Sequence, residues 1–174
     1  MIGRKLINSI KQKQSMRTFR INGAVGAILD EYERAIEELQ QIIESISEEE
    51  LMIKVDLETK DEDCASIQTI LTHIISSGYN YAILVRKHFK EELDYQPKIT
   101  YKTVAEYNVE LSKMFEYNVA LFQSYPNLLD GSSGDKMESR WGQVYDAEQL
   151  FEHAIVHILR HRRQIEIFLM ELWS

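Results

Sequence analysis

Cysteine is the scarcest chemically reactive residue in this chain, with Cys64 the only thiol among 174 residues. A single cysteine excludes an internal disulfide and the zinc sites built from four thiolates. No neighbour in the sequence is suited to lowering its pKa. We therefore interpret Cys64 as a half-buried structural thiol rather than a nucleophile.

Long apolar runs are also missing at the start of the chain, where Ile2, Leu6, Ile7 and Ile10 are scattered among polar residues. We therefore expect neither a secretory signal nor a membrane span. Together with an unpaired thiol, this composition predicts a cytoplasmic protein.

Positive charge is in deficit, because 20 Lys and Arg face 28 Asp and Glu, a net charge of −8. This balance argues against nucleic acid as a partner, since binding it requires clustered basic residues. Residues 1–20 are the exception, with six bases and no acid: Arg4, Lys5, Lys11, Lys13, Arg17 and Arg20. We interpret them as a basic leader that is solvated or lies on an acidic surface, in preference to an anion site. Residues 21–174 are long enough for a single domain with a sizeable core.

What the sequence does contain is helical periodicity. Apolar residues recur every three or four positions in four segments, a pattern typical of amphipathic helices, and no segment alternates as a strand does. The segments run from Val25 to Ile46, from about Ser66 to Val85, from Thr103 to just before Pro126, and from about Asp146 to Trp173. The sequence therefore predicts an all-α protein, a four-helix bundle.

Two stretches between these segments lack periodicity. Residues 47–63 are polar and acidic, although Ser47 and Glu50 are spaced to cap one short turn. Residues 126–145 are longer than most loops of compact domains. We expect Trp141 and Tyr145 to pack the second half of that loop back onto the bundle.

Three of the five histidines lie on the closing segment, at His153, His157 and His161. On an α-helix this spacing places them along one face, with about 6 Å of rise per step. Two imidazoles four residues apart can share a metal ion, but His153 and His161, about 12 Å apart, cannot. His157 and His161 lie closer to the apolar stripe than His153, so they are the better pair.

A third ligand has to come from another helix. His73 and His88 are separated by about 22 Å of helix, so only one of them can contribute. His88 lies between lysines near a helix end, where a histidine is stabilised by the helix dipole and solvent. His73 borders the predicted core and is the better candidate. We predict His73, His157 and His161 as a metal triad; the alternative is that they are hydrogen-bonded core or interface histidines.

Two established metal templates are absent. A carboxylate-bridged di-iron bundle needs Glu three residues before each of two histidines, and the residues there are Ile70, Val85, Leu150, Ala154 and Ile158. The HExxH motif of zinc proteases fails because Ala154 and Ile158 follow the first histidines. Three histidines without carboxylates suit zinc, nickel or a related divalent ion.

At these residues the sequence resembles the DinB-like (DinB/YfiT) family of metal-dependent four-helix-bundle proteins. The family's closing helix carries a histidine, a second one four residues later and then HR-x-Q, matched here by His153, His157 and the run His161 to Gln164. The family's earlier histidine matches His73 in IQTILTHIISSG. The resemblance implies an up-down-down-up bundle and a zinc or nickel ion held by His73, His157 and His161. One departure is Arg163, where the family usually has Gly; we expect it to point away from the metal.

Two functions are open, and the resemblance favours the first. One is an enzyme, a metal-dependent thiol S-transferase using a low-molecular-weight thiol, or a hydrolase with the same ligands. The other is a non-catalytic metal-binding or stress-response protein whose ion is structural or vestigial. A fourth protein ligand would favour the second; we expect Glu152 and His153 to face away from the ion. We expect a small-molecule substrate, no nucleic acid or membrane partner, and a homodimer. Weak candidates for orienting the ligand rings are Gln164, Arg162, Tyr81 and Asn118.

Overall fold

Four long helices form the protein, as the sequence predicted. The computed structural model describes residues 18–130 and 136–174, so most of the basic leader lies outside the described residues. The long helices are α2 (Gly23–Ile43), α4 (Ile67–His88), α5 (Val104–Ser124) and α6 (Ala147–Leu172).

Three of these helices begin at the positions that the sequence predicted. Ser66, Thr103 and Asp146 each accept a hydrogen bond from a backbone N–H in the first turn of α4, α5 and α6, respectively. In each case the third helical residue bonds back to the cap, which satisfies N–H groups that a helix start leaves without partners. The helix N-termini are therefore fixed by local sequence.

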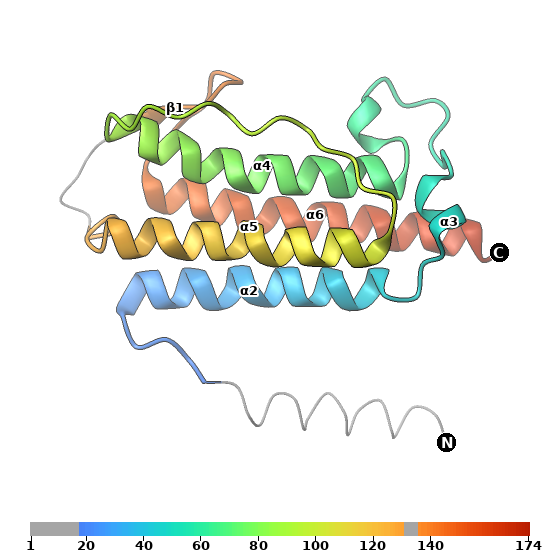
Figure 1. Cartoon of the computed structure of the whole chain (residues 1–174), viewed down its shortest axis with the longest axis horizontal. Helices are drawn as coiled ribbons and strands as arrows, with labels where there is room; N and C mark the ends of the chain where they lie inside the picture. The colour runs from blue at the N-terminus through green and yellow to red at the C-terminus, as the bar shows by residue number, and fades with distance from the viewer. Residues whose placement is uncertain (1–17, 131–135) are drawn as a thin grey trace.

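The order of helix directions is up-down-down-up. In Figure 1, α2 and α6 run one way along the bundle while α4 and α5 run the other way. Helix α4 packs on α5 and α6, and α2 packs on the same two helices, so α2 and α4 lie on a diagonal. The parallel pair α4 and α5 is joined by residues 89–103, which run back along the bundle (Figure 1).

The core lies between the four helices and consists of the apolar side chains that they turn toward one another. Tyr32, Leu71, Tyr107 and Phe151 are among its largest fully buried side chains. Helices α4 and α5 pack tightly at Gly78, where an added Cβ would overlap the Met114 side chain. A residue without a side chain is needed there because Met114 already fills the space.

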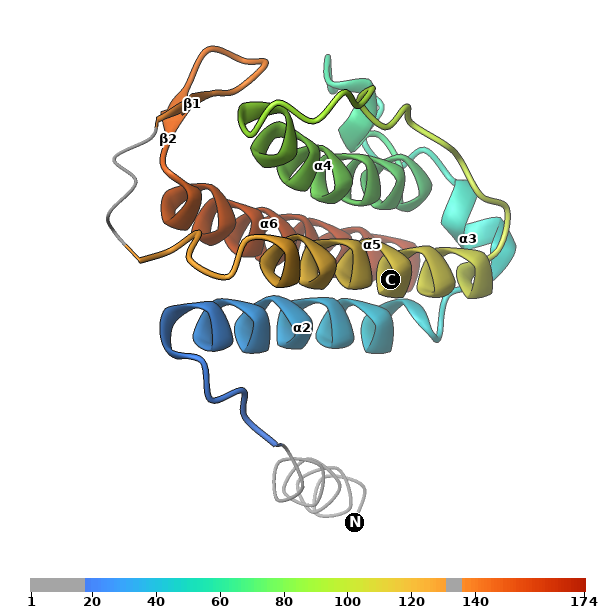
Figure 2. The same cartoon turned by 60° about the vertical axis from the view of Figure 1, so that its left-hand side comes forward.

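Short elements cover the two ends of α4. Helix α3 (Glu48–Met52) and the 3₁₀ turn η1 (Glu62–Cys64) precede it, and α3 has the Ser47 and Glu50 capping box that was predicted. Beyond the other end stands a hairpin of β1 (Met137–Glu138) and β2 (Val144–Tyr145), visible in Figure 2. The expectation of no strands was wrong here, because two-residue strands are too short to produce an alternating pattern.

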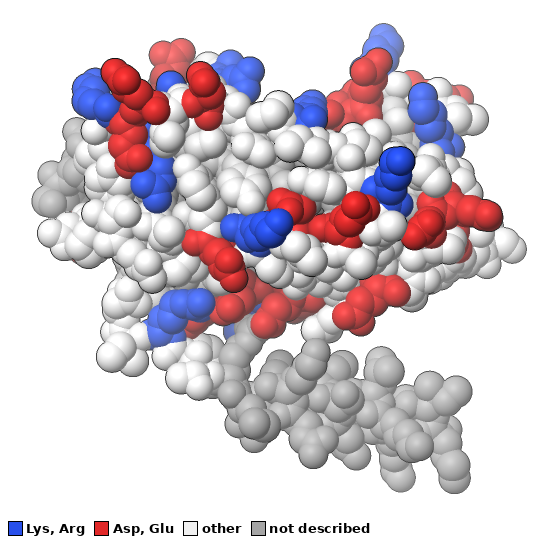
Figure 3. Space-filling view, in the orientation of Figure 1, with Lys and Arg blue, Asp and Glu red and all other residues white. Residues whose placement is uncertain are grey.

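The surface over α2 and α5 is acidic. Figure 3 shows red side chains crossing this face, and the groove between the two helices is lined by Glu33, Glu37 and Glu116. Arg20, the last base of the predicted leader, pairs with Asp30 and Glu33 of α2. In the part of the chain that the structure describes, no helix is both long and apolar enough to span a bilayer.

Candidate metal centre

The three predicted histidines come together between α4 and α6. His73 belongs to α4, and His157 and His161 lie one turn apart on α6, which packs against α4. One ring nitrogen of each lies within 4.8 Å of the corresponding nitrogens of the other two. The ring centroid of His73 is 4.8 Å from that of His157 and 5.0 Å from that of His161. The packing of two helices thus joins residues 84 positions apart.

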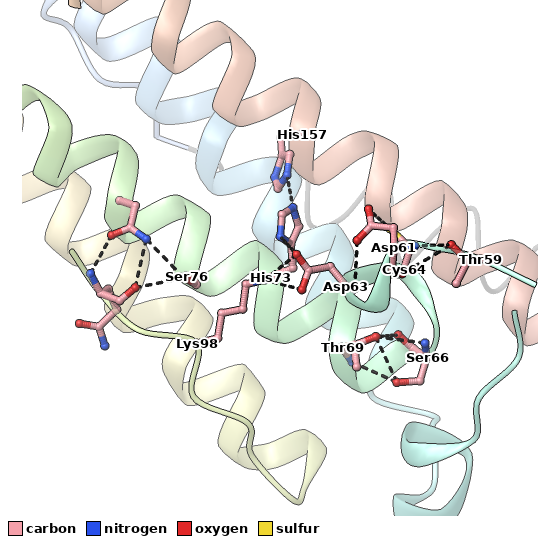
Figure 4. A network of polar contacts seen from close by, with 12 residues as sticks. Thr59, Asp61, Asp63, Cys64, Ser66, Thr69, His73, Ser76, Lys98 and His157 are labelled. Carbon is pink, nitrogen blue, oxygen red and sulfur yellow. Dashed lines mark hydrogen bonds and ion pairs between the residues drawn. The ribbon is translucent and has the colours of Figure 1, made fainter. Parts of the chain in front are cut away.

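His73 is held at both ring nitrogens (Figure 4). Its Nδ1 lies 3.1 Å from the Oδ2 atom of Asp63, and its Nε2 lies 2.8 Å from Nε2 of His157. Asp63 is in η1, directly before α4, and its carboxylate also forms an ion pair with Lys98. With Nδ1–H donated to a carboxylate, the Nε2 lone pair of His73 points toward His157.

His161 is the most deeply buried member, with 1% of its surface exposed. Its Nδ1 lies 3.2 Å from the side-chain oxygen of Gln164. Its Nε2 atom is buried and has no hydrogen-bond partner in the described structure. A buried polar atom without a partner is costly, so this nitrogen fits a site that an added ion would complete.

Burial keeps the three imidazoles neutral. Desolvation by burial is the main cause that lowers the pKa of His157 to about 2. The neighbouring His161, His73, His153 and Arg160 lower it further, because each would repel a protonated His157. Desolvation and His73 lower the pKa of His161 to about 4, and desolvation also lowers that of His73 despite its contact with Asp63. Neutral imidazoles are the form that binds metal, so no proton has to be removed near pH 7.

The donor set fits a divalent ion of borderline softness. Nitrogen ligands of zinc lie at about 2.0–2.1 Å, so two on one ion are about 3–3.5 Å apart. The closest histidine nitrogens here are 2.8 Å apart and the farthest within 4.8 Å, which bracket that spacing. Three imidazoles suit zinc or nickel, as the sequence indicated.

One side of the cluster opens into a cavity of about 440 Å³. His73 and His157 line this cavity, whereas His161 lies behind them. Its remaining lining residues come from η1, α4, α6, the 89–103 connection and the hairpin: Asp63, Ser76, Ser77, Asn80, Tyr81, Leu84, Tyr95, Lys98, Arg140, Trp141, His153 and Arg160. A small molecule in the cavity would therefore reach the cluster from the His73 and His157 side.

The other two histidines lie outside the cluster. His88 contacts the ring of Phe89. His153 was expected to face away from the ion, and it is not a member of the cluster, but it does not turn away from the site. It lines the cavity, stacked against Trp141 and His157 with 6.0 Å between ring centroids in each case. The expected packing of the second half of the loop onto the bundle is confirmed by this Trp141 contact.

Of the four residues suggested as partners of the ligand rings, two contact the cluster and two do not. Gln164 contacts His161, and the Tyr81 ring lies 6.0 Å from that of His157. Arg162 and Asn118 were wrong choices, because Arg162 pairs with Glu38 and Asn118 bonds to the Gly78 and Met114 carbonyls.

Asp63 was missed as a partner of His73. It lies at the end of the aperiodic stretch 47–63, and because Ser66 caps α4, the Asp63 side chain can contact His73. Cys64, next to it, is half-buried, and burial raises the pKa of its thiol, in line with a structural role.

Similarity to known proteins identifies the family of this chain. A search of curated proteins finds no match. A protein-family model, described as the DinB family, matches residues 16–172, which include the four long helices and all three histidines of the cluster. The chain therefore belongs to the DinB family.

Proposed function

We propose that this protein binds one divalent metal ion, zinc or nickel, through His73, His157 and His161. We further propose that it is a metal-dependent enzyme acting on a small molecule in the adjoining cavity. The observation that carries the proposal is the convergence of three neutral imidazoles within 4.8 Å, two of them lining a cavity of about 440 Å³.

The chain's own residues would prepare the site. Asp63 fixes the His73 ring, and Lys98 holds Asp63 in place through two contacts of 2.5 and 2.6 Å. Gln164 fixes the His161 ring. Such partners select the tautomer that offers a lone pair to the ion. When bound, a divalent ion supplies a Lewis acid that lowers the pKa of a coordinated water or thiol toward neutrality.

A three-ligand site supports catalysis over a structural role. Within residues 18–130 and 136–174, no fourth His, Cys, Asp or Glu joins the cluster. Structural zinc sites are closed by four protein ligands, whereas catalytic sites keep a position for water or substrate. The reactions we propose are transfer of a low-molecular-weight thiol or hydrolysis, both of which use such a position.

Metal content tests the first half of the proposal. We expect about one ion per chain in the purified protein, and its loss in His157→Ala and in His161→Ala. His153→Ala is the matched control, since it removes an imidazole one turn away on the same helix that is not a member of the cluster. Equal metal content in the wild type and all three variants would show that these histidines do not bind the ion.

Activity tests the second half. The zinc-loaded and chelator-treated proteins would be compared with a low-molecular-weight thiol plus electrophiles, and separately with esters. We expect turnover that depends on the metal and is lost in His157→Ala. If the metal raises the melting temperature but no substrate turns over, the ion is structural and the alternative of a non-catalytic metal-binding protein holds.

A further inference from the structure

We propose that the cavity beside the histidine cluster is a binding site for a small organic anion, with Arg140 and Arg160 as the groups that bind its carboxylate or phosphate. This names the substrate class of the proposed metal site and rests on that function only in calling the anion a substrate. The anion site itself stands on the cavity's own residues.

The charge of the cavity is opposite to that of the chain. Lys98, Arg140 and Arg160 line it together with a single carboxylate, Asp63, whereas the whole chain has a net charge of −8. Lys98 and Asp63 neutralise each other in an ion pair. The two guanidinium groups are left as the uncompensated charges of the cavity.

Neither arginine has an anionic partner among the described residues. Arg140 contacts only the ring of Tyr95, with its guanidinium carbon 4.9 Å from the ring centroid, and Arg160 makes no ion pair or hydrogen bond there. Elsewhere Arg20, Arg34, Arg86 and Arg162 all pair with carboxylates. A lone surface arginine needs no explanation, but two on one cavity wall, in an acid-rich chain, point to an external anion.

Both arginines are placed by the fold beside the histidines. Arg160 lies three residues after His157 on α6, so it shares the helix face of His153 and His157. Arg140 is at the tip of the β1–β2 hairpin, which closes through a bond from the Ser139 N–H to the Gln143 carbonyl. Gly142, at a φ of 82°, allows the chain to turn there. Stacking on Tyr95 leaves the N–H edges of the Arg140 fork available to oxygen acceptors.

The remaining wall suits a planar or apolar body. Trp141 is 51% exposed, and its ring lies 6.1 Å from Tyr81 and 6.0 Å from His153. Exposed aromatic surface in a cavity favours a ligand that covers it. The ligand that fits all three features has an anionic end for the arginines, a flat or apolar body for Trp141, and a reactive part that reaches His157.

The test uses the full chain, both zinc-loaded and chelator-treated, titrated with benzoate, phenyl phosphate and the neutral analogue benzyl alcohol. Binding is followed by calorimetry and by the indole N–H resonance of Trp141. We expect at least one of the anions to bind at least tenfold more tightly than benzyl alcohol. Its affinity should fall as the salt concentration rises. A preference between the two anions identifies the headgroup.

Charge-removing variants locate the site. We expect Arg140→Gln and Arg160→Gln each to weaken anion binding about tenfold, because each removes charge-assisted hydrogen bonds. Arg160→Lys should retain part of the affinity. Arg163→Gln is the matched control, as it removes an exposed arginine from the same helix outside the cavity.

Equal anion affinity in the wild type, both Gln variants and the control would overturn the proposal, as would benzyl alcohol binding as tightly as the anions. The metal content of each variant is measured in parallel and should equal that of the wild type. If the wild-type protein binds no metal, the proposed function fails, while the titration of the metal-free chain still decides whether the anion site exists.

Discussion

His73 is fixed by two groups from different elements. Asp63 of η1 contacts its Nδ1, and His157 of α6 contacts its Nε2. The first contact sets the orientation of the ring, and the second faces the centre of the cluster. Asp63 should therefore influence metal affinity without being a ligand itself.

We expect Asp63→Asn to weaken zinc binding by about 10- to 100-fold, because the carboxylate that orients and polarises His73 is lost. Competition with a chromogenic chelator would measure the affinity. Glu62→Gln is the control, since Glu62 is the exposed neighbour in the same 3₁₀ turn. If both variants bind zinc as tightly as the wild type, Asp63 has no positioning role.

Among the helices, α4 contributes both to the cavity and to the contact with α5. One side presents His73 and Tyr81 to the cavity, while the Gly78 backbone approaches α5 closely. The Asn118 side chain also donates to the Gly78 carbonyl, which ties the two helices together. The fit at Gly78 therefore sets how far α4 lies from α5.

We expect Gly78→Ala to destabilise the fold by up to about 2 kcal/mol. Overpacking a core costs about 1–3 kcal/mol, and the gain in helix propensity from replacing Gly offsets up to about 1 kcal/mol of it. Urea unfolding would measure the change. Met114→Ala removes the clashing group, so the double variant should lose less stability than the sum of the two single changes. Additive losses would show that Met114 moves aside without cost.

For the molecule as a whole, the buried cluster makes stability depend on pH in the metal-free state. Folding lowers the pKa of His157 to about 2 and of His161 to about 4, whereas a histidine in the unfolded chain has its ordinary pKa of 6.5. Below pH 6.5 the unfolded chain therefore binds more protons than the folded one. The stabilisation is present above that pH and is lost as the pH falls.

We expect the free energy of unfolding of the chelator-treated protein to fall between pH 6.5 and 5. Each buried histidine that stays neutral adds up to about 1.4 kcal/mol per pH unit to that slope. Urea titrations across this range measure it, and His157→Gln should show a shallower slope. Carboxylates contribute equally to both proteins, so identical slopes would mean that His157 is protonated in the folded state.

The homodimer stays a prediction. The outer side of α6 offers a place for a second copy, because exposed apolar side chains recur there in helical spacing: Val156, Leu159, Ile167 and Met170. Cytoplasmic location and the absence of a nucleic-acid partner also stay predictions from composition.

The predicted basic leader lies mostly outside the described residues, because the structure does not describe residues 1–17.

The sequence by itself determined the four helices, the starts of α4, α5 and α6, and the histidine pair of α6. These features depend on interactions within a few residues, namely the periodic apolar stripe, the capping boxes and the one-turn spacing of His157 and His161. The choice of His73 over His88 also followed from local position, and the family pattern supported the same three residues.

Only the tertiary structure decided what surrounds the histidines. Asp63, Arg140, Trp141 and Arg160 reach one cavity from η1, the hairpin and α6, and no local pattern relates such distant positions. His153 shows the same limit, since its distance from the apolar stripe was read as facing away, although packing of the hairpin against it made it part of the cavity wall. Contacts between segments far apart in the sequence depend on how elements pack, which periodicity does not encode.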